Sequence, residues 1–223
     1  MDQILRKAIE RGQKSLSEYE SKAVIESAGV SITREKLARS REQAVTFAEE
    51  IGYPVALKGC SGALAHKTEA GVVKLNLTDA EAVREAYDEI TGRVSKMDGV
   101  LVQEMIKGNR EFVIGLTRDP QFGPCVMFGI GGIFTEVMKD VSFRIAPFTE
   151  SDAEEMIEEI KMKKLLGEFR GSPAVDREAL VRALVGIGEL ALRHSEIAEI
   201  DINPLIIAGN KPVAADALVI LTG

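Results

Sequence analysis

The sequence contains no tryptophan, and aromatic residues make up only 5% of its 223 positions. Base stacking, on which single-stranded nucleic-acid binding depends, therefore has few side chains to use. An excess of positive charge is also lacking, since the formal net charge is −7. A nucleic-acid surface needs a basic excess, so we expect no nucleic acid among the partners.

Cysteine is scarce too, with only Cys60 and Cys125, far apart and among small or apolar residues. Two such cysteines are typical of reduced thiols and favour a cytoplasmic location. No apolar run approaches the length of a membrane span, and the first residues lack the apolar core of a signal peptide. The sequence thus predicts a protein without a membrane segment.

What is present is an ordinary globular mixture, with 45% hydrophobic and 28% charged residues. Ser40 followed by Gln43, with Gly52 further on, predicts a capped helix. Alternating apolar residues predict a half-buried strand over 73–77. The first part of the chain should therefore be a compact mixture of helices and strands, with helices at 4–13, 17–29, 40–52 and 78–97 and strands at 55–58 and 73–77.

After Asp98-Gly99, a predicted turn, strand signals follow one another with few helices between them. We place a lobe boundary at this turn and expect three segments, a helical lead 1–14 and two lobes, 15–98 and 99–223. The fold class is α+β, and a crevice between lobes is a favoured ligand site. In the second lobe we expect strands at 100–105, 111–117, 124–128, 133–138, 141–145, 197–202, 205–207 and 213–220, a turn at 203–204, and helices at 149–160 and 176–194.

A lysine and a His-Lys pair stand on either side of a loop of small residues, 59–65. Lys58 closes an apolar strand, where its ammonium can bind phosphate as a point charge or extend from a strand end to water. His66 can take a phosphoryl group on a ring nitrogen, with Lys67 balancing the negative charge. An exposed loop histidine is the alternative. His194, at a predicted helix end, needs only the helix dipole to explain it.

The glycine-rich stretch 129–132 follows a predicted strand. Its backbone N–H groups can form a nest for phosphate oxygens, above all at Gly131 and Gly132, although tight hairpins look similar. Glu136 and Arg144, on the next two predicted strands, could form an acid–base pair beside a phosphate.

Oxygen-bearing side chains gather near the end of the chain. Asp201 and Asn203 are two residues apart on one face of a predicted strand. Asp216 interrupts an apolar run, where a carboxylate needs a cation or hydrogen bonds. Such oxygens suit Mg²⁺ bound together with nucleotide phosphates. An Asx turn at Asn203 is the alternative.

A possible nucleotide-reading edge lies in residues 103–105 and Glu111. Gln103, Glu104 and Met105 end a predicted strand where a carboxylate and backbone amides could read adenine. Glu111 begins the next strand and could accept hydrogen bonds from the ribose. Two solvent-facing strand residues would explain the same pattern.

Taken together, these stretches resemble the ATP-grasp family, and more narrowly the β subunits of ADP-forming acyl-CoA synthetases, which are related to succinyl-CoA synthetase. The resemblance covers nearly the whole chain. It is carried by His66-Lys-Thr-Glu69, Phe128-Gly-Ile-Gly-Gly-Ile-Phe-Thr-Glu136, Glu199-Ile-Asp-Ile-Asn-Pro204 and residues 19–29, 51–58, 119–124 and 139–147.

The resemblance implies a role for each candidate residue. Two lobes would grip ATP or ADP, with Lys58 and Lys67 near the phosphates and His66 as phosphoryl carrier. The remaining matches are the adenine edge Gln103, Glu104 and Met105, the ribose ligand Glu111, the phosphate site Gly131, Gly132, Glu136 and Arg144, and the Mg²⁺ ligands Asp201, Asn203 and Asp216.

The resemblance also implies the reaction, in which acyl-CoA, phosphate and ADP become acid, CoA and ATP. It implies a partner, a CoA-binding α subunit in an α2β2 heterotetramer. A different carboxylate ligase acting through an acyl phosphate, or a non-catalytic nucleotide-sensing subunit, stays open. One departure is Val72, which stands where the family often has glycine, so the loop that carries His66 can sit differently.

Overall fold

A computed structural model describes residues 1–62, 71–94, 97–132, 140–169 and 171–222. The chain forms two compact units. The small unit contains Leu16–Tyr19 and Thr33–Ile106, and the large unit contains Met1–Ser15, Glu20–Ile32 and Lys107–Gly223. The division differs from the predicted one, because the small unit continues past the turn at Asp98-Gly99.

The small unit is built on a four-stranded antiparallel sheet in the order β1-β4-β2-β3. Its strands are β1 (Glu35–Ala38), β2 (Val55–Cys60), β3 (Val73–Leu77) and β4 (Gly99–Glu104). Strand β4 pairs with both β1 and β2. A boundary before β4 would remove an inner strand from this sheet, which is why the predicted boundary lies inside the unit.

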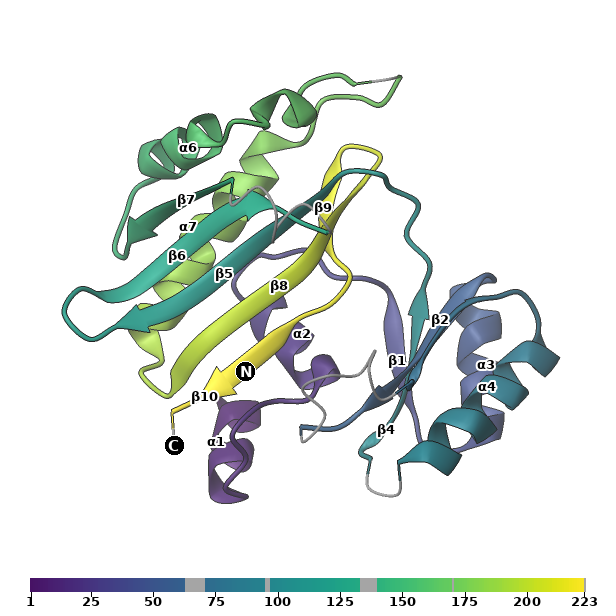
Figure 1. Ribbon diagram of the computed structural model, residues 1–223. Helices are drawn as coiled ribbons and strands as arrows, with labels where there is room; N and C mark the ends of the chain where they lie inside the picture. Colours follow the sequence, from purple (N-terminus) through teal and green to yellow (C-terminus); the bar gives the residue numbers. More distant parts are fainter. Residues whose placement is uncertain (63–70, 95–96, 133–139, 170, 223) are drawn as a thin grey trace. The chain divides into compact units, whose positions relative to one another are not determined.

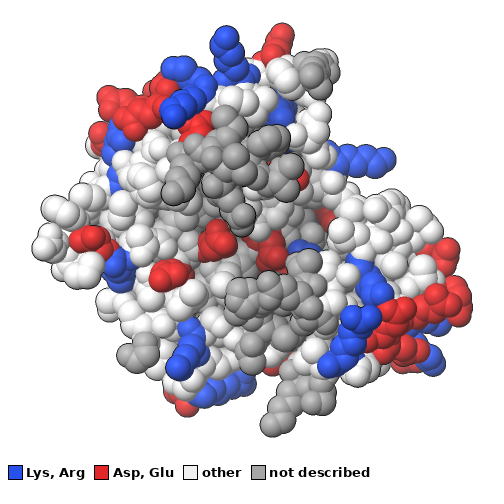
Figure 2. All heavy atoms as spheres, in the orientation of Figure 1, with Lys and Arg blue, Asp and Glu red and all other residues white. Residues whose placement is uncertain are grey.

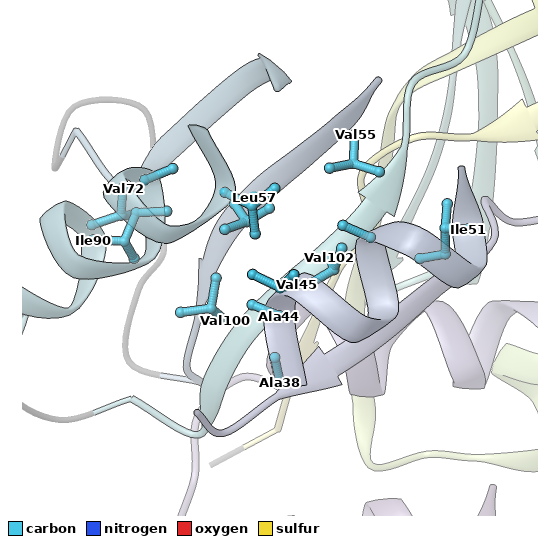
Figure 3. Packing of buried hydrophobic residues seen from close by; sticks show 13 residues of the cluster. Ala38, Ala44, Val45, Ile51, Val55, Leu57, Val72, Ile90, Val100 and Val102 are labelled. Carbon is cyan, nitrogen blue, oxygen red and sulfur yellow. The ribbon is translucent and has the colours of Figure 1, made fainter. Parts of the chain in front are cut away.

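Helices α3 (Arg41–Ile51) and α4 (Ala80–Arg93) complete the core of the small unit. Val55 and Leu57 of β2 pack into this core with Val100 and Val102 of β4, as Figure 3 shows. Val72, the departure from the family pattern, is fully buried in the same core. Gly59 leaves room for it, since a Cβ on Gly59 would lie 3.0 Å from the Cβ of Val72.

Capping residues predicted the start of α3 correctly and that of α4 nearly so. The hydroxyl of Ser40 accepts a hydrogen bond from the Gln43 N–H, and Gly52 ends α3, which confirms both predictions. Helix α4 was predicted to begin at Thr78, but Asp79 is its N-cap and accepts from the Ala82 N–H. An aspartate is the stronger N-cap when both residues are adjacent.

The large unit is built on a six-stranded sheet in the order β10-β8-β5-β6-β7, with β9 pairing on β8 (Figure 1). The strands are β5 (Glu111–Asp119), β6 (Gly123–Ile130), β7 (Val141–Ile145), β8 (Ile197–Ala208), β9 (Lys211–Ala214) and β10 (Leu218–Leu221). The other elements are α1 (Asp2–Glu10), α2 (Glu18–Glu26), α6 (Glu150–Glu159), the 3-10 helix η1 (Lys163–Leu166) and α7 (Arg177–Arg193). The first residues of α2 belong to the small unit.

Helices α6 and α7 cover one face of the large sheet (Figure 1). The residues of β6 that point to this face, including Val126 and Phe128, are fully buried. Both helices were predicted, and the predicted cap Asp176 does cap α7; Thr149 caps α6. The opposite face of the sheet is the one that carries the polar residues described below.

The end of the chain differs from the prediction in two places. Strand β8 continues through residues 203–204, where we predicted a turn. Asn203 and Pro204 lie together opposite Val113 alone, so the pair forms a bulge rather than a turn. The predicted closing strand 213–220 is two strands, β9 and β10, with Asp216 in the segment between them.

Arg110 ties the loops of the large unit together. Its side chain is buried, and its guanidinium donates to the carbonyl oxygens of Leu165, Gly167, Pro173 and Gly209 at 2.9–3.1 Å. A guanidinium has five N–H donors in a fixed plane, which suits it to this task. No sequence pattern indicates this role, because the four acceptors are backbone groups far from Arg110 along the chain.

Two helical glycines should respond in opposite ways to substitution by alanine. A Cβ at Gly186 of α7 would lie 1.9 Å from the carbonyl oxygen of Ala28. We expect Gly186→Ala to lower the free energy of unfolding by about 2 kcal/mol or more, because α7 and the turn that follows α2 must move apart. Gly92 of α4 is exposed and nothing lies near its added Cβ. Gly92→Ala should raise the free energy of unfolding by about 0.5–1 kcal/mol.

Denaturant unfolding of the two variants beside the unchanged protein measures both effects. Equal destabilisation by the two substitutions would contradict the close approach of α7 to Ala28.

Surface charge agrees with the acidic composition. On the face drawn in Figure 2, Lys and Arg lie among Asp and Glu and form no continuous basic patch over the described residues. None of the helices that the structure describes combines the length and the apolar character that a membrane crossing requires.

Candidate functional site

The polar side chains of β8 lie on the face of the large sheet that α6 and α7 leave open. Asp201 and Asn203 are exposed, whereas Ile200 and Ile202 are buried. Strand alternation therefore puts the two oxygen-bearing side chains on one face, as predicted. The bulge that begins at Asn203 is a device that often re-aims a side chain beside a functional site.

Asp201 and Asp216 form a pair of neighbouring carboxylates. Surrounding protein atoms desolvate the Asp201 carboxylate, and this raises its pKa above the usual 3.8; the negative charge of Asp216 raises the pKa further. The Asp216 carboxylate also accepts a hydrogen bond from the Ala217 N–H at 2.8 Å. Two like charges held together in this way are favourable only when a cation or a proton joins them.

The donor set of this pair fits Mg²⁺. Within the described ranges, no three His, Cys, Asp or Glu side chains gather closely enough to hold a metal ion alone. Mg²⁺ does not need them, because it usually takes one or two protein carboxylates and completes its shell with water and phosphate oxygens. Asp201 and Asp216, with the Asn203 amide oxygen nearby along the strand, supply such a partial shell.

Glu111 lies on the same open face. It is two positions along β5 from Val113 and four from Gly115, so the three share one face, and Gly115 pairs with Asp201. Its carboxylate lies against Gly132, where a Cβ would come within 2.6 Å of the Glu111 Oε2. The Gly131 N–H donates to the Glu111 carbonyl oxygen at 2.8 Å. The glycines thus let the chain pass close to β5. The bonded N–H of Gly131 does not support the predicted phosphate contact at that atom.

Arg144 lies on the other face of the large sheet. It pairs with Val126 on β6, which is buried beneath the helices. Its guanidinium donates to both carboxylate oxygens of Glu159, at 2.7 and 3.1 Å, and to Glu155 at 3.3 Å, both on α6. These bonds raise the pKa of Arg144. The structure therefore does not bring Arg144 together with Asp201, and its position is that of a clamp between β7 and α6.

In the small unit, Lys58 is part of a buried ion pair. Its Nζ lies 2.8 Å from Oε1 of Glu18, the first residue of α2. The side chain of Lys58 is 9% exposed and that of Glu18 is 0% exposed. Lys58 points away from the α3–α4 core, because its neighbours Leu57 and Val55 alternate into that core. A lysine held this way differs from the exposed strand-end lysine that was the alternative explanation.

Residues 103–105 divide between the two faces of the small sheet. Gln103 is buried and points to the same face as Lys58. The Glu104 carboxylate accepts from both the backbone N–H and the Nε of Arg34, each at 2.8 Å. The Glu104 N–H in turn donates to the Arg34 carbonyl oxygen at 3.0 Å, so both the carboxylate and the N–H of Glu104 are engaged with Arg34. Met105 follows β4 and is half-buried.

Three predicted site residues lie outside the described residues, namely His66, Lys67 and Glu136. Two partners of predicted residues were missed, namely Glu18 for Lys58 and Arg34 for Glu104. No sequence signal could have found these pairs directly, because 40 and 70 positions separate the partners along the chain.

Comparison with known proteins settles the family. A family model described as an ATP-grasp domain matches residues 7–221. The chain belongs to the ATP-grasp family, and the predicted α+β fold of that family is confirmed.

Individual similar proteins point to one group within this family. The β subunit of acetate–CoA ligase [ADP-forming] I from Pyrococcus furiosus is 46% identical over 225 residues, which cover 97% of each chain. A structure of acetyl-coenzyme A synthetase 1 from Ca. Korarchaeum cryptofilum with coenzyme A and Ca-AMPCP is 48% identical, with a TM-score of 0.93 over 99% of each chain. Another structure of that synthetase contains coenzyme A and Mg-AMPPCP, with its phosphohistidine segment pointing towards the nucleotide site. It is 49% identical, with a TM-score of 0.87 over 99% of each chain.

Proposed function

We propose that this chain is the nucleotide-binding β subunit of an ADP-forming acid–CoA ligase. The reaction converts acyl-CoA, phosphate and ADP into acid, CoA and ATP, and it runs in either direction. The observation that carries the proposal is the carboxylate pair Asp201–Asp216 on the open sheet face, in a chain that matches such a β subunit over nearly its whole length. At that pair the chain can bind the Mg²⁺ that accompanies the nucleotide phosphates.

Each unit has its own part in binding the nucleotide. In the large unit, Asp201, Asn203 and Asp216 would hold Mg²⁺, and Glu111 would accept the ribose hydroxyls. Mg²⁺ supplies charge neutralisation at the phosphate oxygens when it is bound. In the small unit, Lys58 contacts the phosphates, and Gln103, Glu104 and Met105 border the adenine. A Mg-nucleotide in the similar synthetase supports this assignment.

The phosphoryl group travels on His66. Its imidazole nitrogen attacks the phosphorus of the phosphohistidine that the α subunit would carry and displaces that imidazole. A terminal phosphate oxygen of ADP later attacks the same phosphorus and displaces His66, which gives ATP, so that one long transfer is divided into shorter ones. Two residues are the candidates for balancing charge and orienting the imidazole. They are Lys67, next to this histidine, and Glu136, which follows the glycine-rich stretch 129–132 in the sequence. A phosphohistidine segment in the similar synthetase supports the assignment.

The proposed partner is a CoA-binding α subunit, in an α2β2 assembly. The name of the P. furiosus relative, a subunit β, supports a partner of this kind. Co-expression and co-purification with the cognate α subunit, followed by a panel of carboxylic acids, tests the proposal. We expect ATP formation that requires acyl-CoA, ADP, phosphate and both subunits. ADP binding without any acyl-CoA-dependent ATP formation in the assembled complex would instead indicate a nucleotide-sensing subunit.

A further inference from the structure

We propose that Glu18 is a positioning residue for Lys58, which it keeps charged and aimed for the phosphates of the nucleotide. The inference rests on the proposed function, because it gives the buried Glu18–Lys58 ion pair a role in nucleotide binding.

The ion pair joins two residues that are distant in sequence but belong to the same unit. Glu18 opens α2, and Lys58 lies in β2 between Val73 of β3 and Leu101 of β4. The Nζ–Oε1 distance of 2.8 Å is that of a charge-assisted hydrogen bond. Both side chains are almost fully buried. Water can therefore replace neither partner of this contact unless α2 or β2 moves.

Because Lys58 is buried, its ammonium needs a counter-charge, which the Glu18 carboxylate supplies. An ammonium in an apolar setting gives up its proton, or turns toward water, unless a counter-charge holds it. Its strand neighbours Val73 and Leu101 are apolar. Other ionisable groups of the surrounding elements are Lys22, which is fully buried one helical turn along α2 from Glu18, Cys60, two residues along β2, and Glu35, which pairs with Gln103 on β1. Glu18 supplies a fully buried carboxylate in direct contact with Lys58.

The end of a helix favours this carboxylate in turn. The N-terminus of α2 carries the positive end of the helix dipole, which stabilises a negative charge on its first residue. An ammonium has three N–H donors, so Lys58 can hold Glu18 and still donate to a phosphate oxygen. Glu18 thus fixes the direction of Lys58 before the nucleotide arrives and lowers the entropy lost on binding.

A set of variants in the full-length chain tests the inference through ADP affinity, measured by titration calorimetry with Mg²⁺ between pH 6.5 and 9. We expect Glu18→Ala to weaken ADP binding about tenfold at high pH and less at low pH, because a buried lysine that has lost this carboxylate gives up its proton more readily as pH rises. Glu18→Gln keeps an oxygen acceptor but no charge, so we expect a pH-dependent loss of about threefold. Lys58→Met should weaken binding at every pH.

The double variant decides whether Glu18 acts through Lys58. In the Lys58→Met background, Glu18→Ala should cause no further loss of ADP affinity. A further loss there, or an equal loss at every pH in Glu18→Ala alone, would overturn the inference and leave Glu18 a structural residue. Glu50→Gln, which breaks the exposed pair Lys36–Glu50 in the same unit, is the matched control and should leave ADP binding unchanged.

Failure to fold does not remove the test. If Glu18→Ala is unfolded by circular dichroism, Glu18→Gln decides: a pH-dependent loss supports the inference, and unchanged affinity throughout the range overturns it. The unchanged chain separates the two claims. If it binds no ADP, the proposed nucleotide role fails. If it binds ADP and Glu18→Ala binds equally well, only the role of Glu18 fails.

Discussion

Replacing His66 by alanine is expected to lower acyl-CoA-dependent ATP formation in the assembled complex by at least about 10³-fold, since the carrier of the phosphoryl group is then absent. ADP affinity should stay within about twofold, because the substitution leaves Lys58, Asp201 and Asp216 in place. Initial rates and calorimetric ADP titrations on the same preparations measure the two quantities separately.

The second histidine supplies the control. His194 follows α7, and its imidazole lies 3.1 Å from the Glu196 carboxylate and 3.9 Å from that of Asp2. His194→Ala should therefore affect stability and leave the rate of ATP formation nearly unchanged. An unimpaired rate in His66→Ala would refute the phosphohistidine route and favour a carboxylate ligase that forms an acyl phosphate directly.

Replacing Asp201 by asparagine should have two opposite effects. The half-saturating Mg²⁺ concentration for ATP formation should rise at least about tenfold, as expected when a metal-ligating charge is lost. In the absence of metal, the same change should raise the melting temperature at pH 7, because it removes the repulsion between Asp201 and Asp216. A loss of metal affinity together with a gain of metal-free stability identifies a carboxylate pair built for a cation.

The sign of the pH effect follows from the raised pKa of Asp201. The folded protein binds the Asp201 proton more tightly than the unfolded chain does, so this group stabilises the fold below the usual value of 3.8. That contribution is lost as pH rises through the raised value. The advantage of Asp201→Asn should therefore be present at neutral pH and shrink as the solution is acidified.

Melting curves with and without Mg²⁺, from pH 4 to pH 8, measure these effects on the full chain. Glu199→Gln is the matched control, since Glu199 is exposed on the same strand and face, two residues before Asp201. The control should change neither the Mg²⁺-dependent melting shift nor the metal-free stability appreciably. An equal Mg²⁺ response in Asp201→Asn and the unchanged protein would contradict the proposed ligand set.

Local signals predicted much of the fold. Strand alternation placed Asp201 and Asn203 on one face, and side-chain caps located the starts of α3 and α7. Such features depend on residues three or four positions apart, which a sequence displays directly. The resemblance to a family added the order of the motifs, which no single segment could provide.

The features that the sequence prediction missed depend on contacts between residues that are far apart in the sequence. The lobe boundary was placed before β4 because a turn stands there, yet β4 is an inner strand of the small sheet. Arg144 was assigned to the phosphates from its nearness in sequence to the glycine-rich stretch. The register of β7 on β6 instead turns it toward α6. Glu18, the partner of Lys58, could be recognised only after folding brought α2 to β2.

Phosphate labelling tests the central claim most directly. The assembled complex is incubated with acyl-CoA, Mg²⁺ and labelled orthophosphate without ADP, and the two subunits are then separated. The account predicts acid-labile, alkali-stable label on His66 of this chain, which ADP removes as labelled ATP. A complex that forms ATP while this chain never carries label would contradict the account.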